Sequence, residues 1–100
     1  MEQFLYLLKP TRLGMLTEGP SDEESVALGR HVDYLARLVD EGTAILFGRT
    51  QTADESTFGL VIFEAEDEPA ARRVMEADPC VEEGVMTAQL FPYRVAGMRR

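Results

Sequence analysis

A single histidine, His31, is the residue of this chain best suited to acid–base chemistry. An unperturbed imidazole has a pKa of about 6.5, so it takes up or releases a proton near neutral pH. His31 precedes Leu35 by one helical turn and Leu38 by two, which would place it on or beside the inward side of a helix. Spacing alone favours a buried neutral histidine bonded to a backbone carbonyl, and a catalytic histidine is the alternative.

Asp78, directly before Pro79, is the second candidate. The simpler interpretation is an Asp-Pro turn that ends a helix, because proline disfavours a helical conformation in the residue before it. The functional interpretation is a carboxylate that orients the His31 ring. If two helices cover the same face of a sheet, the two side chains are able to meet, but their spacing does not require it.

The other reactive side chains indicate no metal and no cofactor. One histidine and one cysteine far apart in the sequence do not form a zinc set, and Cys80 is expected to be a small buried residue. The acidic runs at residues 22–24 and 82–83 are interpreted as solvated turns, with a carboxylate site for a hard cation as the alternative. No glycine has the spacing of a phosphate-binding loop or a dinucleotide motif.

Composition and charge limit the classes of partner and the cellular compartment that we expect. The chain has 100 residues, which we interpret as one domain over residues 1–100, and a net charge of −8. Such acidity disfavours nucleic acid and anionic membrane surfaces, which need a basic patch. With Cys80 alone no internal disulfide forms. The N-terminus lacks a signal-peptide pattern, and the apolar stretch at residues 4–8 is too short to span a bilayer, so we expect a cytoplasmic protein.

The elements follow the order strand, helix, strand, strand, helix, strand. Ser21 and Glu24 fit a capping box at the start of the first helix, and Gly42 fits its C-terminal cap. Pro92 in the last strand predicts an edge strand or a bulge. The order predicts an α+β, ferredoxin-like fold, in which two helices cover one face of a four-stranded antiparallel sheet. The expected strands are residues 3–9, 43–50, 58–65 and 85–95, the helices are 21–41 and 67–78, and the first helix has the apolar stripe Leu28, Val32, Leu35, Leu38 and Val39.

Two further features of these elements concern binding. Residues 10–20 form a long loop with two prolines and two glycines, which we expect to border a pocket, and Arg12 within it is a candidate for holding an acidic ligand group. The strands at residues 4–8, 44–47 and 60–63 are apolar on both faces. Helices would cover one face only, so we expect the other face to pack against a second copy of the chain as a homodimer.

The sequence resembles the YCII-related (YciI-like) family. The resemblance rests on the helix segment with His31, on residues 46–50, and on Asp78-Pro79 followed by Gly84. It implies a dimeric α+β barrel and a histidine–aspartate pair between sheet and helices, at His31 and Asp78 here. A few members resemble lyases or dehydrochlorinases that act on small cyclic or aromatic compounds. Cys80 departs from the aromatic or aliphatic residue that often follows the pair, which would alter a pocket lining.

These observations leave three interpretations of function. The first is a small cofactor-independent enzyme of unknown substrate, in which His31 acts as general base or acid in lyase- or isomerase-like proton transfer and Asp78 fixes its tautomer. Tyr6, Arg12 and Gly48 are then candidates for substrate binding. The alternative is a non-catalytic, dimeric module that binds a small molecule or regulates a partner. The third is a structural dimer whose pair is a satisfied hydrogen bond.

Overall fold

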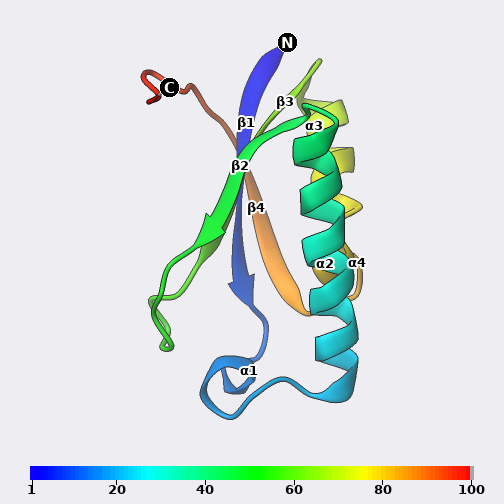
Figure 1. Ribbon diagram of the computed structural model, residues 1–100, viewed down its shortest axis with the longest axis vertical. Coiled ribbons are helices and arrows are strands. Elements are labelled where there is room, and N and C mark those ends of the chain that lie inside the picture. The colour runs from blue at the N-terminus through cyan, green and yellow to red at the C-terminus, as the bar shows by residue number, and fades with distance from the viewer. Residues whose placement is uncertain (100) are drawn as a thin grey trace.

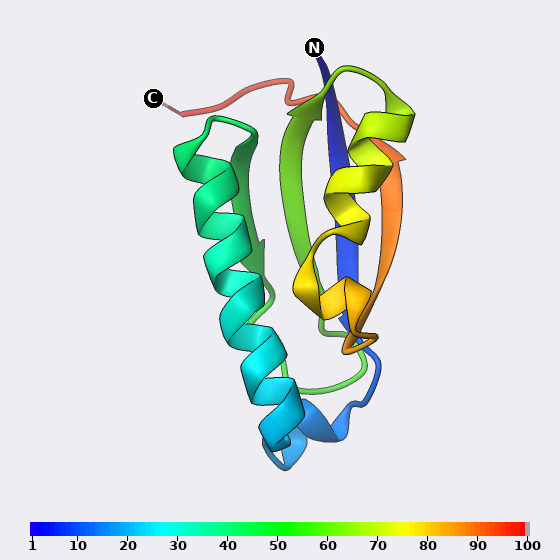
Figure 2. The ribbon, with the colours of Figure 1, turned by 90° about the vertical axis from the view of Figure 1, so that its right-hand side faces the viewer.

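Four antiparallel strands in the order β2-β3-β1-β4 form the sheet of the computed structural model, which describes residues 1–99. Helices α2, α3 and α4 lie on one face of this sheet (Figures 1 and 2). The architecture confirms the expected α+β fold and its helices on one face. No helix within residues 1–99 has the length and apolar character needed to cross a membrane. The elements are β1 (Glu2–Pro10), α1 (Gly14–Thr17), α2 (Asp22–Asp40), β2 (Ala44–Arg49), β3 (Gly59–Ala65), α3 (Glu68–Glu76), α4 (Pro79–Glu82) and β4 (Met86–Pro92).

The long helix α2 begins at the predicted capping box. The Glu24 N–H donates to the Ser21 hydroxyl at 3.2 Å, and the Ser21 N–H donates to the Glu24 carboxylate at 2.8 Å. The buried face of α2 consists of Ala27, His31, Leu35 and Leu38. The predicted stripe was wrong in part, because Val32 and Val39 are 53% and 40% exposed. The small Ala27 faces the sheet instead, together with His31, which the spacing placed on or beside the inward side.

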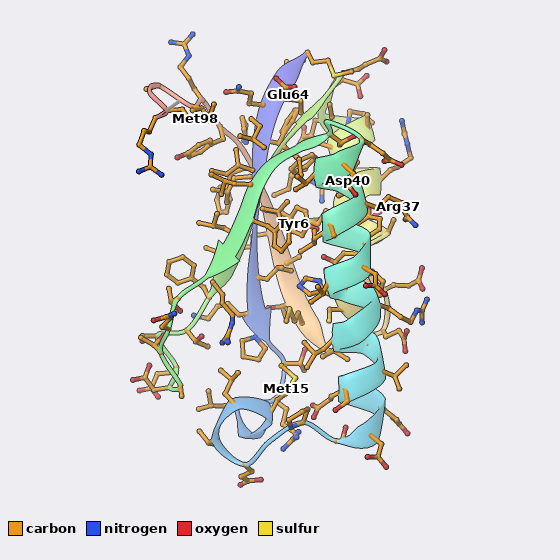
Figure 3. All side chains as sticks on the ribbon, viewed as in Figure 1. Tyr6, Met15, Arg37, Asp40, Glu64 and Met98 are labelled. Atoms are coloured by element: carbon orange, nitrogen blue, oxygen red, sulfur yellow. The ribbon has the colours of Figure 1, made fainter. Side chains whose placement is uncertain are left out.

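The core lies between the sheet and these helices. Alternate residues of β1, Phe4, Tyr6 and Leu8, point to this inner face and are buried. The Tyr6 ring meets the Phe63 ring of β3 edge-on, with 5.6 Å between centroids. Figure 3 shows Tyr6 between the sheet and α2. The side chains of the core therefore pack around the position where His31 projects from α2.

The structure differs from the expected elements at three places. The expected loop at residues 10–20 contains α1, whose Met15 is buried. The second expected helix ends at Glu76, and the separate one-turn helix α4 follows Asp78. The last strand ends at Pro92 rather than residue 95, although Tyr93 still donates its N–H to the Gln3 carbonyl at 3.0 Å. As Pro92 predicted, β4 is an edge strand.

The outer face of the sheet, away from the helices, is apolar at its centre. Leu5 and Leu7 of β1 point to it and are half-buried. Leu46 of β2 and Phe91 of β4 lie on the same face and are 44% and 42% exposed. None of the helices within residues 1–99 covers this face (Figure 1).

Candidate active site

His31 and Asp78 lie in direct contact beneath the inner face of the sheet. The His31 Nδ1 is 2.7 Å from the Asp78 Oδ1, although 47 positions separate the two residues. The His31 side chain is 11% exposed and that of Asp78 is fully buried. The pairing that the sequence permitted without requiring is therefore present.

Asp78 is held by two further donors. As the N-cap of α4, its Oδ1 accepts the Cys80 N–H at 3.0 Å. Its Oδ2 accepts the Tyr6 hydroxyl at 2.8 Å. Burial and the neighbouring Asp78 carboxylate raise the pKa of Tyr6, so the phenol keeps its proton and remains a donor. The Asp78 carboxylate thus accepts hydrogen bonds from the Tyr6 hydroxyl and the Cys80 N–H in addition to its contact with His31.

This arrangement determines which nitrogen of His31 is able to act as a base. A carboxylate that accepts at Oδ1 favours the proton on Nδ1 of a neutral imidazole. The other nitrogen, Nε2, is then left with its lone pair. A carboxylate in this position would also stabilise the imidazolium if Nε2 took up a proton.

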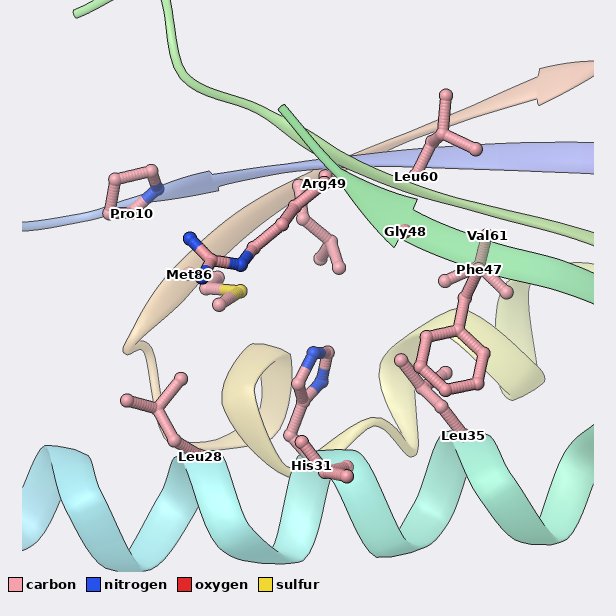
Figure 4. Close-up of a pocket in the computed structure, with 13 residues that line it drawn as sticks. Pro10, Leu28, His31, Leu35, Phe47, Gly48, Arg49, Leu60, Val61 and Met86 are labelled. Carbon is pink, nitrogen blue, oxygen red and sulfur yellow. The ribbon is translucent and has the colours of Figure 1, made fainter. Parts of the chain in front are cut away.

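A cleft of about 290 Å³ opens beside His31, between α2 and the inner face of the sheet. Figure 4 shows the His31 ring rising from α2 into this space and the Arg49 side chain reaching over it from β2. The walls are mostly apolar, which is usual for a site that binds a small organic molecule. The lining residues are Leu8, Pro10, Leu28, His31, Val32, Leu35, Phe47, Gly48, Arg49, Gly59, Leu60, Val61 and Met86.

The structure places the three predicted substrate-binding residues differently. Gly48 lines the cleft. Tyr6 does not, because it is fully buried behind Asp78 and supports the carboxylate from there. Arg12 lies on the surface, where its guanidinium pairs with Glu24 at 2.6 Å, and of residues 10–20 only Pro10 lines the cleft. Cys80 is buried outside the cleft, so the departure from the family pattern does not change the lining.

Sequence reasoning missed Arg49 as a site residue, and a β-bulge explains why. In β2, Ala44 pairs with Phe63 on the inner face, and strict alternation would then turn residues 46 and 48 inward. The register shifts between Ala44 and Leu46, so Phe47 and Arg49 face the cleft instead. No residue pattern in the segment marks the bulge.

The pair and Cys80 together form a group of side chains of the types that bind metal ions. Donor atoms of His31, Asp78 and Cys80 lie within 4.8 Å of one another, although the sequence separation argued against such a cluster. The Asp78 carboxylate already accepts three hydrogen bonds. Burial and the neighbouring Asp78 raise the pKa of the Cys80 thiol to about 12, whereas metals bind the thiolate. The arrangement fits a hydrogen-bonded network better than a metal centre.

The surface pair of Arg12 and Glu24 predicts an acid-range effect on stability. The hydrogen bond from Arg12 and the backbone bond from Ser21 lower the pKa of Glu24 from 4.5 to about 2. A carboxyl group whose pKa is lower in the folded state than in the unfolded state stabilises the fold at pH values above its unfolded-state pKa. This stabilisation is lost as the pH falls through the folded-state pKa. Thermal unfolding followed by circular dichroism should therefore show a smaller loss between pH 4.5 and about 2 in Glu24→Gln than in the parent.

Glu23→Gln is the matched control for that comparison, since it removes the same charge one residue earlier and Glu23 makes no ion pair within residues 1–99. Its pH profile should follow the parent. Parallel profiles for the parent and Glu24→Gln would contradict the assigned pairing.

The comparisons with known proteins agree with this fold. The family model for YCII-related domains matches residues 5–93. The chain is similar to the 5-chloro-2-hydroxyhydroquinone dehydrochlorinase TftG from Burkholderia phenoliruptrix AC1100, solved in complex with 2,5-dihydroxybenzoquinone, with a TM-score of 0.63 and 19% identity over 91% of this chain and 93% of that chain. It is also similar to two structures of SnoaB, a cofactor-independent oxygenase from Streptomyces nogalater. Their TM-scores are 0.53 and 0.50 and their identities 13% and 11%, over 98% of this chain and 97% of theirs. No curated protein sequence matches the chain.

Proposed function

Because this chain belongs to the family of YCII-related domains, we propose that it is a small cofactor-independent enzyme in which His31 transfers a proton from or to a small organic substrate. The observation that carries the proposal is the hydrogen-bonded series Tyr6–Asp78–His31, which ends at an apolar cleft. A buried carboxylate behind an imidazole is the arrangement that makes histidine an effective base. That TftG is a dehydrochlorinase and SnoaB a cofactor-independent oxygenase supports it, since both reactions are carried out on this fold.

The proposed reaction begins with proton abstraction. His31 Nε2 takes a proton from a carbon beside a carbonyl group, and the electron pair of the C–H bond moves to the carbonyl oxygen as an enolate. Asp78 stabilises the resulting imidazolium. In an isomerisation, the enolate electrons re-form the carbonyl and shift a neighbouring double bond, and the imidazolium gives its proton to the far carbon of that bond. In an elimination, they re-form the carbonyl and make a carbon–carbon double bond, and the bond to a leaving group on the adjacent carbon breaks. That group departs with the electron pair and takes the proton from the imidazolium.

An assay for proton transfer needs no knowledge of the natural substrate. One-ring ketones and chlorinated hydroxyhydroquinones would be incubated with the protein in heavy water. We expect proton NMR to show deuterium replacing hydrogen next to the carbonyl, or chloride electrodes to show release of chloride, faster than in buffer. Compounds that bind in the cleft without any exchange or release would favour the non-catalytic binding module instead.

The proposal includes a homodimer formed through the outer face of the sheet. Leu5, half-buried, lies at its centre, opposite Ile62 of β3 and Phe91 of β4. Packing this face against the same face of a second copy would remove its apolar surface from water. We therefore expect sedimentation at micromolar concentration to give twice the mass of the 11.2 kDa chain.

Two variants would locate the dimer interface. Leu5→Glu should sediment as a monomer, because two charges would face one another in an apolar interface. Val26→Glu introduces the same charge at a position of α2 that is 62% exposed, and it should remain a dimer. A monomeric parent protein, or a dimeric Leu5→Glu variant, would rule out this face as the interface.

A further inference from the structure

Among residues 1–99, Arg49 is the only lysine or arginine that lines the cleft. It pairs in register with Gly59 of β3, and both line the cleft from the inner face. A Cβ at position 59 would lie 3.3 Å from the Gly48 carbonyl oxygen and 3.7 Å from the Arg49 Cβ, so glycine leaves space beside the base of the arginine. Figure 4 shows the Arg49 guanidinium and the His31 ring facing the same space from opposite walls.

The cleft is electrostatically unlike the rest of the molecule. The chain has 18 acidic residues and 10 lysines and arginines, yet in the described part of the chain, residues 1–99, no aspartate or glutamate lines the cleft. Arg12, Arg30 and Arg72 are paired with glutamates. Arg49 makes no hydrogen bond or ion pair of its side chain within residues 1–99. Its fork of N–H donors is therefore free to bind a ligand oxygen.

We infer that Arg49 anchors an anionic oxygen, so that the cleft takes a small one-ring acid with a carboxylate, phenolate or enolate group. A cavity of about 150 Å³ holds benzene, so a cleft of about 290 Å³ holds one ring with its substituents. One arginine suits a singly charged group, whereas a phosphate would need further donors, such as a glycine-rich loop or a helix N-terminus, that the lining lacks. The inference rests on the proposed function only in naming this ligand as the substrate.

Paired probes test the anchor without any turnover. Benzoate and benzamide have nearly the same shape and differ in charge. The isotope-labelled protein would be titrated with each, and the backbone amide signals of Gly48 and Gly59 would report binding in the cleft. We expect benzoate to bind more tightly, and Arg49→Gln to weaken benzoate by about tenfold or more while benzamide changes little. Arg49→Lys should keep part of the preference for the anion.

Arg72→Gln is the matched control, because it removes the same charge at a surface position of α3 that is paired with Glu68 at 3.4 Å. It should bind both probes as the parent does, and circular dichroism would check that each variant is folded. Equal affinity of the parent for the two probes, no binding of either at millimolar concentration, or unchanged benzoate binding in Arg49→Gln would each overturn the inference.

The proposed proton transfer is tested independently of the Arg49 anchor. His31→Gln should retain the preference for benzoate, since the anchor is Arg49. A preference for benzoate that Arg49→Gln removes, in a protein without proton exchange on any probe, would support the anchor and overturn the enzyme. Proton exchange that needs His31, with benzoate binding that does not need Arg49, would do the opposite.

Discussion

Replacement of His31 with glutamine is expected to lower the rate of proton exchange on an active probe by about 10²–10⁴-fold, the range that a positioned acid–base group contributes. Glutamine retains a polar side chain in the cleft but has no group that titrates near neutral pH. Binding of the probe should be little changed, because the apolar walls and Arg49 remain. The measurement is the deuterium-incorporation rate at saturating probe.

Two supporting variants should give a graded series. Asp78→Asn retains an oxygen that accepts from Cys80 and His31, and its amide group would face the Tyr6 hydroxyl, which is able to accept. It removes only the charge that stabilises the imidazolium, so we expect a loss of about 10–100-fold. Tyr6→Phe removes one neutral donor to Asp78 and should cost less. A His31→Gln variant as fast as the parent would exclude His31 as the base.

Replacement of Asp78 with alanine is expected to lower the free energy of unfolding by about 3–5 kcal/mol. The reason is that three donors, the Tyr6 hydroxyl, the Cys80 N–H and the His31 Nδ1–H, would lose their acceptor in a buried place. Urea unfolding followed by circular dichroism measures the change. Asp78→Asn should cost much less, because it retains an acceptor for Cys80 and His31.

Asp67→Ala provides a matched control in the same fold. Asp67 is also an N-cap, with a proline in the first turn that follows, and its carboxylate accepts the Ala70 N–H at 2.9 Å on the surface. Its loss should cost about 1 kcal/mol, which is typical of an exposed cap. The difference between the two variants measures the buried network. Equal effects would mean that Asp78 serves only as a cap.

Local patterns in the sequence were sufficient for most of the fold. The capping box at Ser21 and the edge strand at Pro92 each depend on residues close together in the chain, and each is present. The inward position of His31 was predicted, but the rest of the α2 face was predicted less well, because hydrophobicity favoured Val32 and Val39 over the small Ala27. Packing close to a sheet favours small residues, which hydrophobicity alone does not weigh.

The candidate site was predictable only in part. The residue types indicated His31 and Asp78, but the contact between them depends on how two helices pack on the sheet. The hydrogen bond from Tyr6 to Asp78 joins residues 72 positions apart, so no local sequence pattern predicts it. The bulge that turns Arg49 into the cleft is likewise a property of strand pairing rather than of the segment itself.

The central claim is that Asp78 holds the His31 ring with Nδ1 protonated and with Nε2 as the base toward the cleft. Long-range nitrogen–proton NMR correlations of the isotope-labelled protein report directly which ring nitrogen carries the proton. Because the chain has one histidine, the signals need no further assignment. At a pH where the ring is neutral, we predict a protonated Nδ1 and an unprotonated Nε2 whose shift responds to benzoate. A neutral ring protonated at Nε2, or an Nε2 signal indifferent to every probe that binds, would contradict it.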